Sequence, residues 1–184
     1  AFDIMMMLAI PMVVGAMMLS EPIMRLIAGD DFAGSGMALR VLALAVFGVY
    51  LGAVFGHAAV AINRQKSSLW VYISNAVITV TGYLIVIPRF GMMGAAWMTV
   101  FSELYAGILL FFVVRHYSKQ RLSFVGFGKM LFAAGVMAAL LYQIPTWNIG
   151  VQVILGGAVY GLVLMATGVV SKQTIEEILT LKRG

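Results

Sequence analysis

The stretch from Tyr83 to Glu103 limits the possible folds of this chain more than any other part of it. An apolar run ends at Pro88, glycines follow at Gly91 and Gly94, and a second apolar run then begins that contains one acid, Glu103. Proline cannot continue the hydrogen-bond ladder of a helix, and glycine tolerates the dihedral angles of a tight turn. The stretch therefore predicts a hairpin of two apolar helices, with the acid about halfway along the second.

The scarcity of charge extends this conclusion to the whole chain. Of its 184 residues, 62% are hydrophobic and only 10% are charged, and the mean hydropathy is +1.02. A soluble domain carries about 25% charged residues, so the surface of this chain is expected to face lipid. The sequence contains no cysteine, which excludes disulfides and thiolate chemistry.

Six apolar segments are long enough, or nearly so, to cross the bilayer core, which takes about 20 helical residues. In lipid, only helices and closed barrels satisfy every backbone polar group, and the alternating pattern of barrel strands is absent. We therefore predict an all-α, polytopic helical membrane protein. The predicted helices cover residues 4–27, 37–62, 68–87, 93–115, 128–144 and 149–170, and residues 171–184 form a tail that is either a short interfacial helix or a frayed terminus.

The basic residues predict how the chain is oriented. Nine of the twelve Lys and Arg side chains lie in the connections 63–68 and 115–129 and in the tail, and only three lie on the opposite side. Cytoplasmic loops carry an excess of Lys and Arg, so these connections and the C-terminus are expected in the cytoplasm of a multi-pass plasma-membrane protein. This distribution accounts for the net charge of +5 without a nucleic-acid partner.

Glu103 is the strongest candidate for a functional residue. A carboxylate near the bilayer midplane costs about 2.5–3.5 kcal/mol on insertion scales, so it should face protein or a water-filled cavity. Thr99 and Gly107, each four residues away, fall on its side of the helix, and Ser102 directly precedes it. The carboxylate is interpreted either as a cavity group that couples to a cation or touches substrate, or as a group that links two helices by hydrogen bonds.

Other polar residues within the apolar segments are open to two interpretations. Asn75 and Thr79 suit hydrogen bonds between helices, or contact with a ligand. Arg40 can extend its charged head toward the membrane surface, or line a vestibule that attracts an anionic head group. Glycines at positions 48, 52 and 56 predict close helix packing, and His57 after them is expected to be solvated rather than to sense pH.

Motifs for catalysis are missing from the sequence. It has no phosphate-binding loop, no HExxH zinc pattern, and no Ser, His and Asp set placed to form a nucleophilic triad. We therefore expect no enzymatic activity, no metal site and no cofactor.

The hairpin motif, IPxFGxxGAAxxTxxSE from Ile87 to Glu103, resembles the C-terminal half of polysaccharide (O-antigen-type) flippases of the multidrug/oligosaccharidyl-lipid/polysaccharide exporter superfamily. The segment from Pro22 through Gly29 to Ala33 resembles the region that precedes the hairpin in that family. Many relatives carry Asn where this chain has Thr79 and Tyr83, which argues against a sodium site at that place.

The resemblance implies a fragment, in which residues 1–170 form most of one lobe of a two-lobe transporter and the N-terminal lobe is missing. Such a transporter moves an isoprenoid-pyrophosphate-linked glycan across the membrane by alternating access. Its substrate or ion pathway is then expected to include five residues of this chain: Glu103, Thr99, Asn75, Thr79 and Arg40.

Two other functions remain open at this point. A multidrug and toxin extrusion antiporter has the same general fold and would bind hydrophobic cations. A non-transporting membrane scaffold would need neither a substrate nor an ion site. Cavity Arg and Lys residues in the missing half would favour a pyrophosphate substrate, whereas lone acids there would favour drug export.

Overall fold

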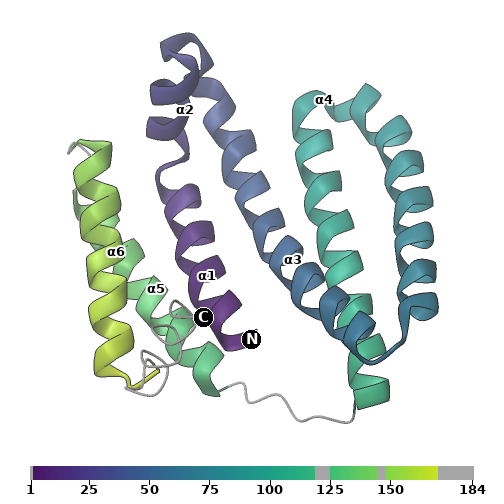
Figure 1. The fold of residues 1–184 in the computed structure, drawn as a ribbon. Helices are drawn as coiled ribbons and strands as arrows, with labels where there is room; N and C mark the ends of the chain where they lie inside the picture. The colour runs from purple at the N-terminus through teal and green to yellow at the C-terminus, as the bar shows by residue number, and fades with distance from the viewer. Residues whose placement is uncertain (1, 119–124, 145–147, 170–184) are drawn as a thin grey trace. The chain divides into compact units, whose positions relative to one another are not determined.

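The computed structural model describes residues 2–118, 125–144 and 148–169, and throughout these residues the regular structure is helical. The predicted all-helical fold is therefore confirmed for this part of the chain. Two compact units, Ala1–Leu122 and Ser123–Gly184, make up the chain. The first contains α1 (Phe2–Met18), α2 (Ser20–Ala28), a 3-10 helix η1 (Asp30–Ser35), α3 (Gly36–Ala61) and α4 (Gln65–Ser118), and the second contains α5 (Val125–Gln143) and α6 (Ile149–Ala166) (Figure 1).

Within the described residues, four helical segments are long and apolar enough to cross a membrane: Asp30–Ala61, Gln65–Ser118, Gly126–Gln143 and Ile149–Ala166. The bent pair α1 and α2 adds a fifth if the two helices form one span. Long apolar helices of this kind are compatible with a membrane protein. The 54 residues of α4 count as one segment here, although the helix is interrupted.

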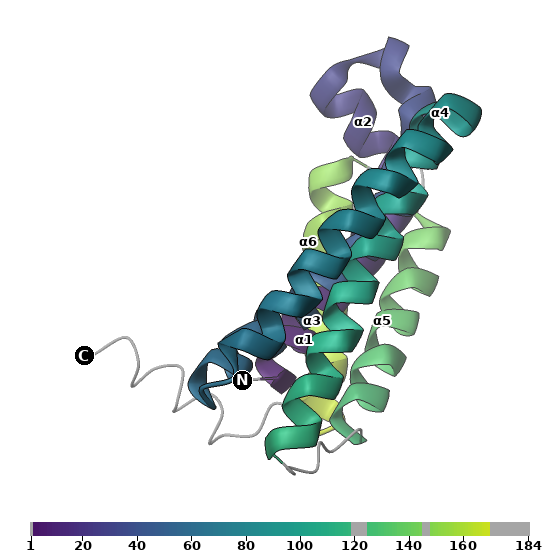
Figure 2. The same ribbon diagram turned by 90° about the vertical axis from the view of Figure 1, so that its right-hand side faces the viewer.

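The interruption in α4 lies at Gly91, whose φ of 55° and ψ of −138° are not helical. This positive φ is readily adopted only by glycine. On either side, a first arm (65–90) and a second arm (92–118) run back along each other (Figures 1 and 2). A Cβ on Gly94 would lie 2.8 Å from the carbonyl oxygen of Val86, so the turn also needs a second glycine. The predicted hairpin is present, but the predicted stop at Pro88 is wrong, because Pro88 lies inside the first arm and the helix continues to the break at Gly91.

The predicted single helix over 4–27 is wrong, because the chain bends by 76° between α1 and α2. Pro22 has no N–H to donate to the carbonyl of Met18, and its ring crowds that carbonyl. The bend falls at Leu19, which has φ of −101° and ψ of 13°. The apolar run over 4–27 predicted one helix because its composition hides the effect of Pro22.

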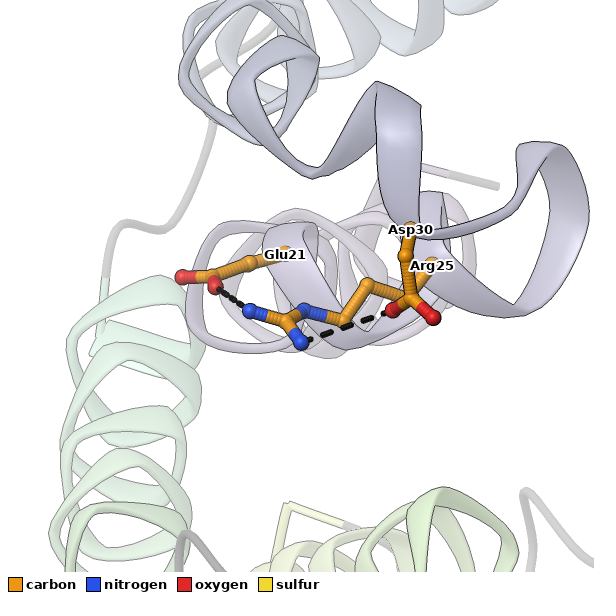
Figure 3. A network of polar contacts seen from close by, with 3 residues as sticks. All are labelled: Glu21, Arg25 and Asp30. Atoms are coloured by element: carbon orange, nitrogen blue, oxygen red, sulfur yellow. Dashed lines mark hydrogen bonds and ion pairs between the residues drawn. The ribbon is translucent and has the colours of Figure 1, made fainter.

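The end of α2 is joined to η1 by exposed ion pairs (Figure 3). Arg25 contacts Glu21 at 2.8 Å within α2 and Asp30 at 3.5 Å at the start of η1. Gly29 between them has φ of 91°, which a side chain would strain. Exposed ion pairs contribute little to stability, so the turn depends mainly on Gly29.

The core of the first unit lies between α3 and α4. Val41 and Ala45 of α3 pack against Ala96 and Val100 of the second arm, and Phe55 packs further along with Val71 and Leu110. Between these two clusters the helix backbones touch, because a Cβ on Gly48 would lie 2.6 Å from the carbonyl carbon of Glu103.

The second unit is an antiparallel pair of helices. Lys129 near the start of α5 donates to the carbonyl of Thr167 just after α6, at 2.8 Å. Gln152, buried in α6, donates through Nε2 to the carbonyl of Ile144 at 3.0 Å. The helix or frayed end expected for the tail 171–184 lies outside the described residues.

Candidate functional site

A cleft with a volume of about 560 Å³ lies between α3 and the two arms of α4. It extends along α3 from Val49 to Val60, which is about 16 Å at the helical rise of 1.5 Å per residue. Its lining is mostly apolar, with a few polar groups. The lining residues are Val49, Gly52, Ala53, Gly56, His57 and Val60 of α3, Gln65, Ser68, Leu69 and Tyr72 of the first arm, and Glu103 and Ala106 of the second arm.

Glu103 is the acid of this cleft. It is half-buried, and its neighbours Ser102, Ala106 and Gly107 are buried against the rest of the unit. Among the described residues, none forms a hydrogen bond or an ion pair with its carboxylate. The expectation that Glu103 faces a cavity agrees with this position. For the alternative role, a hydrogen-bonded link between two helices, the described residues offer the carboxylate no partner.

The three glycines of α3 differ in what they contact. Gly48 packs against the backbone of the second arm, as the sequence predicted. A Cβ on Gly52 would meet no atom within 4 Å, and one on Gly56 would lie 2.8 Å from the hydroxyl oxygen of Tyr72. Gly52 and Gly56 therefore border the cleft, although the backbone nitrogen of Gly52 also lies close to the second arm, 3.3 Å from where a Cβ on Gly107 would be.

Tyr72 and His57 bring polar atoms to the part of the cleft nearer the α3–α4 turn. The hydroxyl of Tyr72 reaches from the first arm to the backbone of Gly56. His57 is exposed, and its Nδ1 lies 2.6 Å from the carbonyl oxygen of Ala53. Sequence reasoning missed Tyr72, although Ser68 and Tyr72 share one face of the first arm at a spacing of four residues.

Three other predicted site residues stabilise the hairpin instead of lining the cleft. The hydroxyl of Thr99 donates to the carbonyl of Ala95 at 3.0 Å and lies 2.7 Å from the hydroxyl of Tyr83 across the hairpin. Thr79 donates to the amide oxygen of Asn75 at 3.4 Å on the first arm. The bond between Thr99 and Tyr83 joins the two arms, whereas the bond between Thr79 and Asn75 lies within the first arm, so the bonds between helices expected for Asn75 and Thr79 are not observed among the described residues.

Arg40 lies at the bend between α1 and α2. Its Nε donates to the carbonyl of Met17 at 3.1 Å and to the hydroxyl of Ser20 at 3.3 Å. The bend leaves carbonyl groups short of helical partners, and Arg40 supplies one of the missing donors. It does not line the cleft, so Glu103 is the only one of the five predicted site residues found there.

The described part of the chain contains no group of three His, Cys, Asp or Glu residues that could hold a metal ion. Comparisons of the chain with known protein families, with curated proteins and with solved structures find no match. The cleft and the motif of the α4 hairpin are therefore the two features of this chain that bear on its function.

Proposed function

We propose that this chain is the C-terminal part of a plasma-membrane transporter that flips a lipid-linked oligosaccharide for the synthesis of a cell-surface polysaccharide. The observation that carries the proposal is the α4 hairpin, whose motif resembles the polysaccharide flippases and whose second arm brings Glu103 to a cleft beside α3. A carboxylate retained in an apolar helix is costly, and such residues commonly mark substrate or ion pathways. No catalytic step is part of this proposal.

We propose that the chain crosses the membrane six times. A span requires about 20 residues. Each arm of α4 is longer than that, so α4 supplies two spans. The bent pair α1 and α2 supplies one, and α3, α5 and α6 supply one each. Six helices would form most of one lobe, and alternating access requires a second lobe that moves against it.

Glu103 is the group that we assign to the pathway in the transporter. Thr99 bonds to Tyr83 across the hairpin, Asn75 and Thr79 bond to each other within the first arm, and Arg40 donates to a carbonyl at the bend near Leu19. The substrate would be an isoprenoid-pyrophosphate-linked glycan, held between the two lobes. The second lobe is expected to supply the cationic groups that a pyrophosphate needs.

Flipping can be measured in proteoliposomes with a fluorescent isoprenoid-pyrophosphate sugar and a membrane-impermeant quencher. We expect the product of the complete gene to flip the lipid, Glu103→Leu to abolish flipping, and the 184-residue chain alone to be inactive. Asp31→Asn, an exposed acid in η1, is the control that should retain flipping. Normal flipping by correctly folded Glu103→Leu would contradict the role of Glu103, and full activity of the 184-residue chain would contradict the two-lobe proposal.

The proposed orientation has its own test, because the chain contains no native cysteine. A membrane-impermeant thiol reagent added to intact cells should modify Ser35→Cys and Asn148→Cys. It should leave Ser67→Cys and Ser118→Cys unmodified until the membrane is opened. Labelling of both Ser67→Cys and Ser118→Cys in intact cells would overturn the orientation with a cytoplasmic C-terminus.

A further inference from the structure

The short helix α2 carries apolar and charged side chains on opposite faces. Ile23, Leu26 and Ile27 share one face at spacings of three and four residues, whereas Glu21 and Arg25 share the other. Leu26 is 70% exposed and Ile27 is 76% exposed, so this end of the apolar face is left uncovered by the described residues. Exposed apolar patches with a polar rim are typical of surfaces that contact another protein or a membrane.

The bend before α2 determines the direction of this helix. The helix α1 has 17 residues and is about 25 Å long at 1.5 Å per residue, which nearly crosses the hydrocarbon core of about 30 Å. Because α2 turns by 76° from α1, it runs nearly along the membrane plane when α1 crosses the membrane. Figures 1 and 2 show α2 at the same end of the first unit as the turn of the α4 hairpin, so both elements are expected at one surface of the bilayer.

Contacts with α3 hold α2 in this direction. Arg40 of α3 donates through Nε to the carbonyl of Met17 and to the hydroxyl of Ser20, which lie on the two sides of the bend. A Cβ on Gly36 would lie 2.9 Å from the Cα of Glu21, so the start of α3 also packs closely against the first turn of α2. The apolar face of α2 therefore has a fixed direction relative to α1 and α3.

The charges of α2 and η1 limit the depth at which this segment can lie. Glu21, Arg25 and Asp30 are joined by ion pairs (Figure 3), and Asp31 adds another exposed carboxylate. So many ionised groups are costly in the hydrocarbon core, whereas the apolar face is unfavourable in bulk water. An amphipathic helix satisfies both faces at the interface, where its apolar side lies about 5–10 Å into the boundary between head groups and acyl chains.

The net charge of the segment indicates which lipid surface fits it. Residues 20–35 contain three acids, Glu21, Asp30 and Asp31, and one basic residue, Arg25, which gives a net charge of −2. Anionic lipids attract basic segments and repel acidic ones. The fitting surface is therefore one of zwitterionic lipids, held through apolar contact.

We propose that α2 and η1 form an interfacial anchor, in which the face of Ile23, Leu26 and Ile27 inserts below the head groups of zwitterionic lipids and the ion pairs of Arg25 face water. The anchor fixes the end of α1 at the membrane surface. This inference requires that the chain lies in a membrane, but it does not depend on flippase activity.

The first test measures the depth of single positions in phosphatidylcholine nanodiscs. Because the chain has no native cysteine, Ile27→Cys, Ala28→Cys and Val77→Cys each carry one fluorescent probe. The quenchers are lipids with a nitroxide at carbon 5 or carbon 12 of an acyl chain, and iodide in the water. We expect the shallow nitroxide to quench the Ile27 probe at least about twofold more than the deep one does. Val77, exposed midway along the first arm, should show the reverse, and Ala28, which shares the face of Glu21, should be quenched mainly by iodide.

The second test changes the inserted face and reads the effect from a probe at Leu26→Cys. Adding Ile27→Glu should lower quenching by the shallow nitroxide at least about twofold, because it places a carboxylate on the lipid-facing side. Ala28→Glu is the matched control, since it adds the same charge to the polar face and should leave quenching unchanged. Replacing about a third of the phosphatidylcholine by phosphatidylglycerol should not increase quenching, because the segment is acidic.

Four results would overturn the proposal. Stronger quenching of the Ile27 probe by the deep nitroxide would place α2 in the core as half of a broken span, and quenching by iodide alone would place it in water. Protection from all three quenchers, in this chain or in the product of the complete gene, would mean that protein covers the face. Stronger quenching in phosphatidylglycerol would identify a site for anionic lipids instead. Circular dichroism of each variant verifies that it remains helical.

Discussion

The α3–α4 pair and the α5–α6 pair differ in how closely their two helices pack and in how their polar groups are paired. In the first, Gly48 lets the helix backbones touch, and the space beside this contact remains open as the cleft that holds Glu103. In the second, a Cβ on Gly156 would lie in ordinary contact with Leu141 and Met137, at 3.4–3.6 Å, and the buried polar group Gln152 has a hydrogen-bond partner. In the α3–α4 pair, close backbone contact occurs beside Glu103, which has no partner among the described residues. In the α5–α6 pair, side chains pack between the helices, and the amide of Gln152 is hydrogen-bonded.

This difference separates a site from a scaffold. A buried polar group with its hydrogen bonds made stabilises a structure, whereas an unpaired carboxylate adds a cost that packing must offset. The difference between the two helix pairs can be tested by the free energy of unfolding of variants. This free energy is measured in mixed micelles during titration with a denaturing detergent.

The largest expected difference is between two glycine substitutions. Gly48→Ala places a Cβ within 2.6–2.7 Å of backbone atoms of Glu103 and Leu104, which cannot move without separating α3 from α4. We expect it to lower the free energy of unfolding by about 2 kcal/mol, the usual cost of overpacking. Gly156→Ala is the control and should be neutral within about 0.5 kcal/mol, because its Cβ would make ordinary contacts. Equal losses at both positions would show that the two interfaces do not differ in packing.

A smaller effect should distinguish the buried Gln152 from the half-buried Glu103. Gln152→Leu removes the donor to the carbonyl of Ile144 and should cost about 1 kcal/mol. Glu103→Gln removes a charge that has no described partner, so it should cause no loss of stability and should instead raise the free energy of unfolding. If Glu103→Gln destabilised the chain more than Gln152→Leu, the carboxylate would have a structural role and the contrast between the pairs would fail.

The smallest expected effect concerns the hairpin itself. Tyr83→Phe removes the 2.7 Å hydrogen bond to Thr99 between the two arms of α4, at a cost of about 0.6 kcal/mol, the average for such bonds in membrane helices. Tyr142→Phe, at a residue of α5 that is 78% exposed, is the matched control and should be neutral. An unchanged Tyr83→Phe variant would mean that the turn at Gly91 holds the arms together without this bond.

Much of the fold was predictable from the sequence for a physical reason. An apolar segment without water must form its own hydrogen bonds, so each long apolar run predicts a helix, and most predicted ends agree with α3, α5 and α6 within a few residues. Pro88, Gly91 and Gly94 likewise predicted the hairpin, because a turn needs residues that stop a helix and tolerate unusual dihedral angles. The bend at Leu19 was missed because Pro22 lies inside an apolar run that was taken as one span.

The candidate site was only partly predictable. The cost of a charge in lipid identified Glu103 from the sequence alone. Helical spacing could not show that Thr99 bonds to Tyr83 across the hairpin, or that Arg40 donates to Met17 at a bend. Those contacts depend on which helix faces which, and that depends on tertiary packing.

By itself, then, the amino-acid sequence determined a helical chain with lipid-facing surfaces, a glycine turn in α4 and one acid that has to avoid lipid. Only the tertiary structure decided that Gly48 would bring α3 against the second arm while Gly52 and Gly56 would leave a cleft beside Tyr72. Local residue chemistry is enough to form a helix and a turn, because their hydrogen bonds close within a few residues. A cleft depends on the distance between helices that are far apart in the sequence, and that distance is set by the closest backbone contact between them.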